Sequence, residues 1–127
     1  MLFQCPASFR ANKENVTRLR AFFEKAKRGK SLMGWEPRGD WDDELVASLC
    51  RELDLIHVAD PLKSPPAIIG PIQYYRLHGM TGARHRFAIA ELERLRGFCC
   101  GKKPTYCLFN NMAMTTDAQR FHALQQA

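Results

Sequence analysis

Five short apolar runs alternate along the chain with longer segments whose apolar residues recur at helical spacing. Short runs of this kind predict strands that are buried on both faces. The predicted strands cover residues 2–5, 31–35, 55–59, 72–77 and 105–109. The connection at residues 61–71 is punctuated by prolines, which predicts an irregular segment rather than a crossover helix.

Four amphipathic helices are predicted between and after these strands. Asn12 and Gly29 bound the first helix, and acidic residues after Asp40 fill the first turn of the second, where the helix dipole favours negative charge. The last helix is expected to start at a cap formed by Thr115 or Thr116. The alternation of strands and helices predicts the α/β class, with a parallel sheet covered by helices.

The predicted strand ends are polar. Ligands of parallel α/β folds bind at the carboxyl ends of the strands. In this chain those ends carry Gln4, Glu36, Arg38, Asp60, Arg76, His78, Asn110 and Asn111. Because strand side chains alternate between faces, Glu36 is expected to share a face with Arg38. Arg76 and His78 share a face for the same reason, so the sequence predicts a converging cluster of acids, bases and amides.

Two interpretations of this cluster differ in their chemistry. In the first, Arg38 and Arg76 bind an anionic group through forked hydrogen bonds, and Glu36, Asp60 or His78 moves protons. In the second, the same residues form a structural ion-pair network. Polar residues at five successive strand ends favour the binding pocket.

The sequence gives little support for a metal or a cofactor. Glu36, Asp60, His57 and His78 are possible ligands of a divalent ion, but they lack the dense spacing of a metal site. His57 lies in an apolar run, which favours a hydrogen-bonded core histidine. The glycine-containing stretches are too sparse for phosphate-binding loops. We therefore expect no metal and no cofactor.

The cysteines indicate a reducing environment. Cys5, Cys50, Cys99, Cys100 and Cys107 lack the CxxC spacing of zinc or thioredoxin-like sites and are expected to be free thiols in the cytosol. The adjacent Cys99 and Cys100 form either a redox-active pair or buried thiols, and buried thiols are favoured. No run approaches the ~18 apolar residues of a membrane span, and no secretion signal is present. A cytoplasmic protein without a membrane partner is predicted.

The net charge of +6 is distributed unevenly. Residues 10–30 carry eight Lys or Arg against two Glu, residues 31–60 carry two Arg against eight acids, and residues 61–127 carry nine Lys or Arg against three acids. The basic segment 10–30 and the basic loop 79–86 are candidates for binding nucleic acid or another polyanion. A solvated helix face and a mobile solvated loop are the favoured alternatives, because Phe87 is the single aromatic residue beside the loop.

Seven short phrases in this sequence resemble, in the same order, the family called domain of unknown function 72 (DUF72, YecE-like). They are LFQCPASF at 2–9, WEPR at 35–38, HVADP at 57–61, PP at 65–66, YRLHG at 75–79, ELERL at 91–95 and FNN at 109–111. One phrase differs from the family: the usual Ser/Thr-Asp cap before the ELERL helix is absent, at a cost of ~1 kcal/mol.

The resemblance implies a TIM-barrel-like fold and a set of site residues. A full barrel has eight strands and about 250 residues, so residues 1–127 match the C-terminal portion, roughly strands four to eight, with the N-terminal strands absent. The family positions matched at the barrel mouth are Glu36, Arg38, Asp60, Arg76, His78, Asn110 and Asn111. The resemblance implies no known reaction. The similarity of the family's barrel to endonuclease and sugar-isomerase barrels favours a phosphate- or sugar-containing ligand.

Three functions stay open at this point, and whether the chain is an enzyme stays open with them. The first is a partial barrel with an anion-binding site that acts on a phosphate- or sugar-containing substrate. The second is a non-catalytic nucleic-acid-binding module, and the third is an inactive, truncated remnant of a full barrel. Because a partial barrel exposes strand edges, we expect self-association or a partner chain that supplies the missing strands.

Overall fold

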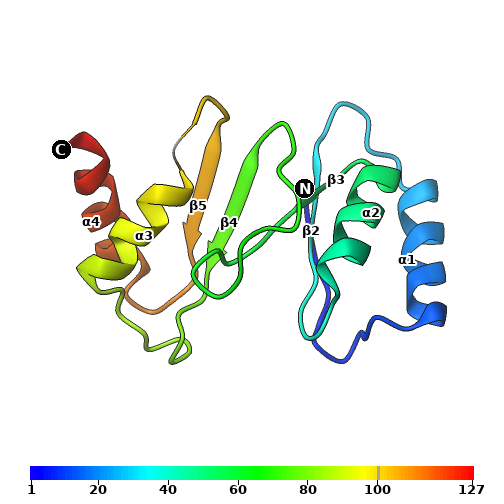
Figure 1. The fold of residues 1–127 in the computed structure, drawn as a ribbon, viewed down its shortest axis with the longest axis horizontal. Helices are drawn as coiled ribbons and strands as arrows, with labels where there is room; N and C mark the ends of the chain where they lie inside the picture. The colour runs from blue at the N-terminus through cyan, green and yellow to red at the C-terminus, as the bar shows by residue number, and fades with distance from the viewer. Residues whose placement is uncertain (100) are drawn as a thin grey trace. The chain divides into compact units, whose positions relative to one another are not determined.

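The computed structural model describes residues 1–99 and 101–127, and the chain divides into two compact units. The first unit contains Met1–Val58 and Ala67–Pro71, and the second contains Ala59–Pro66 and Ile72–Ala127. The elements in chain order are β1 (Leu2–Gln4), α1 (Lys13–Lys25), β2 (Met33–Glu36), α2 (Asp43–Leu53), β3 (Leu55–His57), β4 (Gln73–Leu77), α3 (Ile89–Phe98), β5 (Thr105–Phe109) and α4 (Met114–Gln126), as Figure 1 shows.

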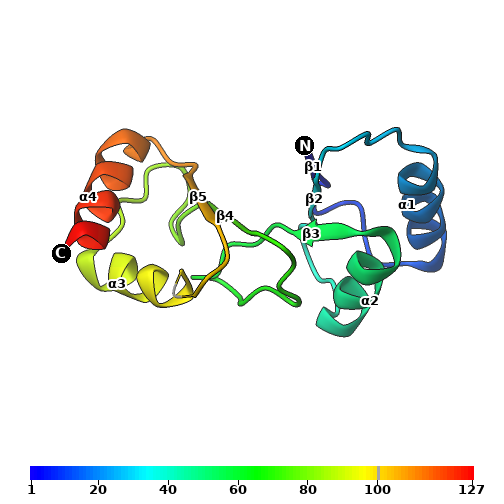
Figure 2. The same cartoon turned by 90° about the horizontal axis from the view of Figure 1, so that it is seen from above.

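The first unit is a parallel sheet with strand order β1-β2-β3. Helices α1 and α2 lie on the same face of this sheet (Figures 1 and 2). Trp35 of β2 is completely buried in the core between sheet and helices, where its ring meets the Trp41 ring edge to face at 5.1 Å. Strand alternation then directs its neighbour Glu36 to the opposite face.

The helix boundaries of the first unit follow from local hydrogen bonds. The Asn12 side chain accepts from the Asn15 backbone N–H at 2.8 Å, which confirms the predicted cap of α1. The predicted end at Gly29 is wrong, because α1 stops at Lys25. Asp42 rather than Asp40 caps α2, by accepting from the Leu45 N–H at 3.2 Å.

His57 at the end of β3 is a hydrogen-bonded interior histidine, as its apolar neighbours predict. Its Nδ1 accepts from the Ala67 backbone N–H at 2.9 Å, which anchors the returning segment Ala67–Pro71 to β3. Burial lowers the pKa of His57, and the nearby Asp43 and Glu36 carboxylates oppose that shift only in part. The neutral ring is therefore the folded form, because a protonated Nδ1 has no lone pair left to accept this bond.

The lowered pKa of His57 predicts that the protein loses stability in mild acid. An imidazole whose folded pKa lies below its unfolded value of about 6.5 adds stability above pH 6.5, and that stability is lost as pH falls toward the folded pKa. His57→Asn keeps an acceptor near Nδ1 and removes the titration. Urea unfolding at pH 7.5 and 5.5 should show a smaller loss for His57→Asn than for the wild type. Equal losses would show that His57 does not carry this dependence.

The second unit is a two-stranded parallel sheet of β4 and β5. Helices α3 and α4 lie together on one face of it (Figures 1 and 2). The core on that face contains Leu62, Tyr75, Leu77, Phe87, Leu92, Leu95, Phe109 and Phe121. Tyr75 and Leu77 are odd-numbered, so strand alternation puts Arg76 on the opposite face, across from its register partner Leu108.

Neither helix of the second unit begins with the side-chain cap typical of helices. Helix α3 follows Ala88, which has no side-chain acceptor, as the missing cap in the sequence predicts. The Glu91 carboxylate takes over part of this role by accepting from the Ala88 N–H at 2.9 Å. The predicted threonine cap of α4 is wrong: the helix follows Ala113, so Thr115 and Thr116 lie inside its first turn.

The α/β class and the parallel strand direction are confirmed, whereas one continuous sheet is not found among the described residues. The strands form one three-stranded and one two-stranded sheet, and they close no barrel within residues 1–99 and 101–127. The predicted third strand is shorter than expected, with β3 ending at His57. Beyond it, Ala59 forms an isolated bridge with Tyr75, in which the Arg76 N–H donates to the Ala59 carbonyl at 3.0 Å.

Candidate functional site

Asp60 organises the carboxyl end of β4. Its Oδ2 accepts from the His78 backbone N–H at 3.0 Å, and its Oδ1 accepts from the Leu62 N–H at 3.2 Å. Both carboxylate oxygens are therefore engaged by backbone donors on opposite sides of the side chain. The carboxylate therefore fixes the backbone of His78, the residue that follows β4.

His78 is oriented by the end of β5. The Asn110 Nδ2 lies 3.3 Å from the His78 Nδ1. Because an amide NH₂ group only donates, Nδ1 is the acceptor, and the neutral ring carries its proton on Nε2. The Asn110 backbone N–H also donates to the Leu77 carbonyl at 2.8 Å, so the bond joins two strand ends that are already fixed. His78 is thereby held in one tautomer and one orientation.

Arg76 belongs to the same end of the sheet. It is half-buried, and strand alternation places it on the face that α3 and α4 do not cover, together with His78 two residues later. Asn110 follows Leu108 on the equivalent face of β5. A guanidinium, an imidazole and an amide therefore occur together at the carboxyl ends of β4 and β5.

The basic loop 79–86 is anchored at several points. The Met112 N–H donates to the Ala83 carbonyl at 2.7 Å, and the Asn111 Nδ2 donates to the His85 carbonyl at 2.7 Å. Gly79 has φ +84°, and its lack of a side chain lets the His85 ring pack against it. These bonds argue against the expected mobile loop and fix its backbone beside the end of β5.

Three side chains in and after this loop form a hydrogen-bonded chain that sequence reasoning missed. Thr81 Oγ1 lies 3.0 Å from His85 Nδ1, and His85 Nε2 lies 2.9 and 3.0 Å from the two Glu91 oxygens. A hydroxyl, an imidazole and a carboxylate in this order can relay a proton. The same bonds hold the loop against the start of α3. No spacing rule predicts this chain, because it depends on the turn between Gly79 and Gly82.

Asn111 differs from the other predicted site residues because it is buried inside the second unit. Its Nδ2 donates to Asp117 Oδ2 at 2.9 Å as well as to the His85 carbonyl, and the residue is 5% exposed. Its Oδ1 has no hydrogen-bond partner among the described residues. The amide of Asn111 therefore connects the loop to α4, which is a positioning role.

Glu36 and Arg38 lie in the first unit. Glu36 ends β2 and is 4% exposed, with its backbone carbonyl accepting from the Cys5 N–H at 3.1 Å. Arg38 follows two residues after the strand and is half-buried. The predicted site residues are thus divided between the two units, five of them in the second, and their union in a single mouth stays a prediction.

Three of the eight basic residues at positions 10–30 form ion pairs that the structure shows. Arg18 pairs with Glu14 on the same helix, Arg20 pairs with Glu52 on α2, and Arg28 pairs with Asp54. Arg28 also donates to the Leu53 carbonyl at 2.6 Å, at the C-terminal end of α2. Whether this segment is a solvated helix face or a nucleic-acid surface stays a prediction.

The described residues were also compared with the requirements of a metal site, a membrane span and a disulfide. Among residues 1–99 and 101–127, no group of three or more His, Cys, Asp or Glu side chains is arranged to hold a metal ion. The same residues contain no helix with the length and apolar content needed to cross a bilayer. The four described cysteines, Cys5, Cys50, Cys99 and Cys107, are free thiols, and Cys100 lies outside the described residues.

A comparison with family models gives one result that covers the whole chain. The model described as "Protein of unknown function DUF72" matches residues 1–127. No match was found among curated proteins, and none among solved structures. The matched residues include every strand end described above.

Proposed function

The chain belongs to the DUF72 family of proteins of unknown function, and from this premise we propose that the carboxyl ends of β4 and β5 bind a small anion that carries a phosphate group. The observation that carries the proposal is the fixed pair His78 and Asn110 on the same face as Arg76. Nothing in the family description names a substrate, so the proposal depends on this geometry.

The chemistry of the three side chains suits a phosphate-bearing ligand. A guanidinium supplies a fork of N–H donors that matches two oxygens of one phosphate. The imidazole of His78 adds a hydrogen-bond donor at Nε2. Asp60 keeps His78 in place by accepting its backbone N–H through Oδ2.

A catalytic role on a sugar phosphate is the further step of the same proposal. His78 and Asp60 are the proton-handling candidates of the second unit, and Arg38 with Glu36 are the corresponding clamp and acid of the first. The proposed fold for this role is part of a TIM-barrel-like sheet to which all five strands belong, with its open edges covered by a second copy or a partner chain. The chemistry required is proton transfer at a carbon or oxygen next to a bound phosphate.

Binding of inorganic phosphate and glucose 6-phosphate, measured by calorimetry, tests the proposal. Arg76→Gln is expected to lower the affinity about tenfold or more, since it removes the charged fork and leaves a single amide. Arg84→Gln is the matched control, because it removes the same charge from an exposed loop position. Its affinity should change less than about twofold, as screened surface charges contribute little.

Equal losses in the two variants would show diffuse attraction of anions rather than a site. If the protein binds neither phosphate compound but retards single-stranded DNA in a gel, and if this retardation decreases steeply with salt, the result supports the nucleic-acid-binding module instead. Urea unfolding of Arg76→Gln separates lost binding from lost folding, because a loss of affinity counts only if the folded fraction is unchanged.

A further inference from the structure

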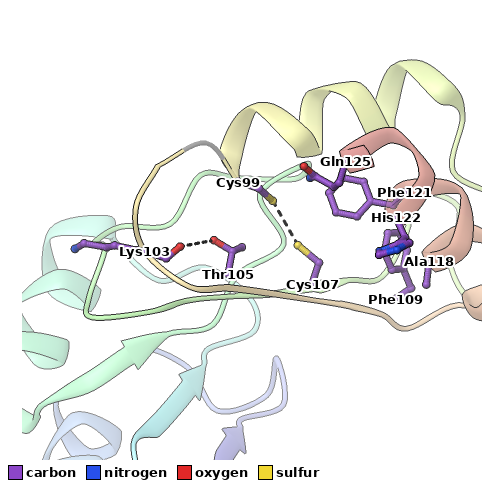
Figure 3. A pocket seen from close by; sticks show the side chains of 9 residues that line it. All are labelled: Cys99, Lys103, Thr105, Cys107, Phe109, Ala118, Phe121, His122 and Gln125. Atoms are coloured by element: carbon purple, nitrogen blue, oxygen red, sulfur yellow. Dashed lines mark hydrogen bonds between the residues drawn. The ribbon is translucent and has the colours of Figure 1, made fainter. Parts of the chain in front are cut away.

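A pocket behind β5 brings two thiols together at the end of α3. It has a volume of about 410 Å³ and is lined by Cys99, Lys103, Thr105, Cys107, Phe109, Ala118, Phe121, His122 and Gln125, which Figure 3 shows. Cys99 caps the C-terminal end of α3, and Cys107 lies in the middle of β5 on its helix-facing side. Residues from three elements of the second unit therefore enclose one small cavity.

The two sulfur atoms are close enough to react with each other. They lie 3.5 Å apart, joined by a thiol–thiol hydrogen bond (Figure 3). A disulfide needs about 2.05 Å, so the sulfurs must approach by roughly 1.5 Å, which small rotations about two Cα–Cβ bonds supply. Cys99 is well placed to move, because it lies at the end of its helix with φ −91° and ψ 1° rather than in the helix interior.

The two thiols are chemically different. The hydrogen bond from Cys107 stabilises the Cys99 thiolate and lowers the pKa of Cys99, while the same bond and burial raise the pKa of Cys107. The Lys103 amino group points away from the sulfurs in Figure 3, so the hydrogen bond is the contact that favours the thiolate. Cys99 is therefore the nucleophile of the pair and Cys107 the second thiol, which attacks later.

A third cysteine provides an internal reference. Cys50 is 2% exposed, and burial raises its pKa to about 12. It lies in the core of the first unit, with no sulfur partner among the residues that the structure describes. A solvent-borne oxidant that enters the pocket meets Cys99 and Cys107, whereas Cys50 is shielded from it.

We propose that Cys99 and Cys107 form a thiol–disulfide redox site that reacts with small peroxides. The Cys99 sulfur attacks one peroxide oxygen, so an S–O bond forms, the O–O bond breaks, and the leaving hydroxide takes up a proton to become water. The Cys107 sulfur then attacks the Cys99 sulfenic acid, forming the S–S bond and releasing the S–OH oxygen as a second water. One peroxide and two thiols thus give one disulfide and two waters.

The test uses the full chain with Cys5→Ser and Cys100→Ser, which leaves the proposed pair and Cys50. Hydrogen peroxide should lower the intact mass by about 2 Da, and dithiothreitol should reverse the change. Trypsin cuts after Arg96, Lys102 and Arg120, so the disulfide should join peptides 97–102 and 103–120. In the Cys107→Ser variant, peroxide should instead yield a sulfenic acid at Cys99 that dimedone traps.

A second measurement needs no change at either thiol. Iodoacetamide at pH 7 should alkylate Cys99 at least about tenfold faster than Cys107 or Cys50, because the thiolate is the reacting form. The proposal is overturned if peroxide causes no 2 Da loss, if the loss survives Cys107→Ser, or if Cys107 is alkylated first. The alkylation is measured with both thiols in place, so its result tests the proposal even if a serine variant fails to fold.

Discussion

Replacing Gly79 by alanine is expected to destabilise the second unit by about 3 kcal/mol. Gly79 has φ +84°, a conformation that costs an L-residue roughly 1–2 kcal/mol. A Cβ at this position would also lie 2.4 Å from the His85 Cβ, which must move, and such overpacking adds roughly 1–3 kcal/mol. The free energy of unfolding in urea, measured for wild type and variant, checks the value.

Gly82→Ala is the matched control for this experiment. Gly82 has φ +88°, nearly the same conformation, but no atom lies within 4 Å of the added Cβ. The control therefore isolates backbone strain and should cost about 1–2 kcal/mol. The difference between the two variants measures the packing of His85 against Gly79, and equal costs would contradict the structural role given to this contact.

The Gly79→Ala variant also tests the hydrogen-bonded chain formed by the side chains of Thr81, His85 and Glu91. Displacing the His85 ring breaks its 2.9 Å contact with Glu91, so the start of α3 loses the carboxylate orientation that satisfies Ala88. Hydrogen exchange at the first turn of α3 should accelerate in Gly79→Ala and stay unchanged in Gly82→Ala.

The sequence predicts the order of strands and helices well. Apolar residues repeat every two positions in a strand and about every 3.6 in a helix, and both repeats can be read from residues that are close in the chain. The runs around Trp35 and Tyr75 are apolar on the helix-facing positions, and the structure buries both rings almost completely. Helix ends were harder. Gly29 is a typical helix terminator, yet α1 stops at Lys25, where the capping residue Ala26 donates its N–H to the Phe22 carbonyl.

The candidate site was predictable only in part. The polar strand ends at Arg76, His78 and Asn110 follow from the rule that carboxyl ends of parallel strands meet at one edge. The orientation of His78 does not follow from any pattern, since it depends on Asn110 from another strand 32 residues away. Asn110 and Asn111 are both predicted site residues, but alternation directs adjacent strand-end residues to opposite sides, and Asn111 is buried.

After β3 ends at His57, the described residues reach β4 through an isolated bridge between Ala59 and Tyr75 rather than through a full strand ladder. The Val58 N–H donates to the Trp35 carbonyl, whereas the next residue, Ala59, donates to the Tyr74 carbonyl. Successive N–H groups of an extended segment point to opposite sides, so these two bonds follow ordinary strand alternation, and the pairing with β4 at this point is an isolated bridge. A periodicity argument counts apolar positions and carries no information about which neighbour receives each backbone bond.

Replacing Asp117 by alanine is expected to cost about 3 kcal/mol at pH 7. The carboxylate is 1% exposed and accepts from three donors, the Asn111 amide at 2.9 Å, the Phe87 N–H at 3.2 Å and the Arg120 guanidinium at 2.9 Å. Truncation leaves these donors without their acceptor, and removing one partner of a buried charged network costs roughly 3–5 kcal/mol. Asp40→Ala, which removes an exposed carboxylate, should cost less than about 0.5 kcal/mol.

The pH dependence of this difference identifies the charged form as the one that stabilises. Burial raises the pKa of Asp117, but the bonds from Asn111, Phe87 and Arg120 outweigh it and leave the pKa below its usual value of 3.8. A carboxylate whose pKa is lower in the folded than in the unfolded protein stabilises the fold at any pH above the unfolded pKa. That stabilisation is lost as the pH falls through the folded pKa. The gap between wild type and Asp117→Ala should therefore be constant from pH 7 to about 5 and shrink below about pH 4.

The same comparison separates a charged network from simple packing at Asp117. If the side chain only filled space between Phe87 and α4, the gap would persist unchanged at pH 3, because the volume lost on truncation does not depend on protonation. A gap that closes in acid requires the ionised acceptor, and it ties the fold of the second unit to the Asn111 amide that also holds the loop carbonyl of His85. Through that amide, loss of the Asp117 charge should loosen loop 79–86 as well.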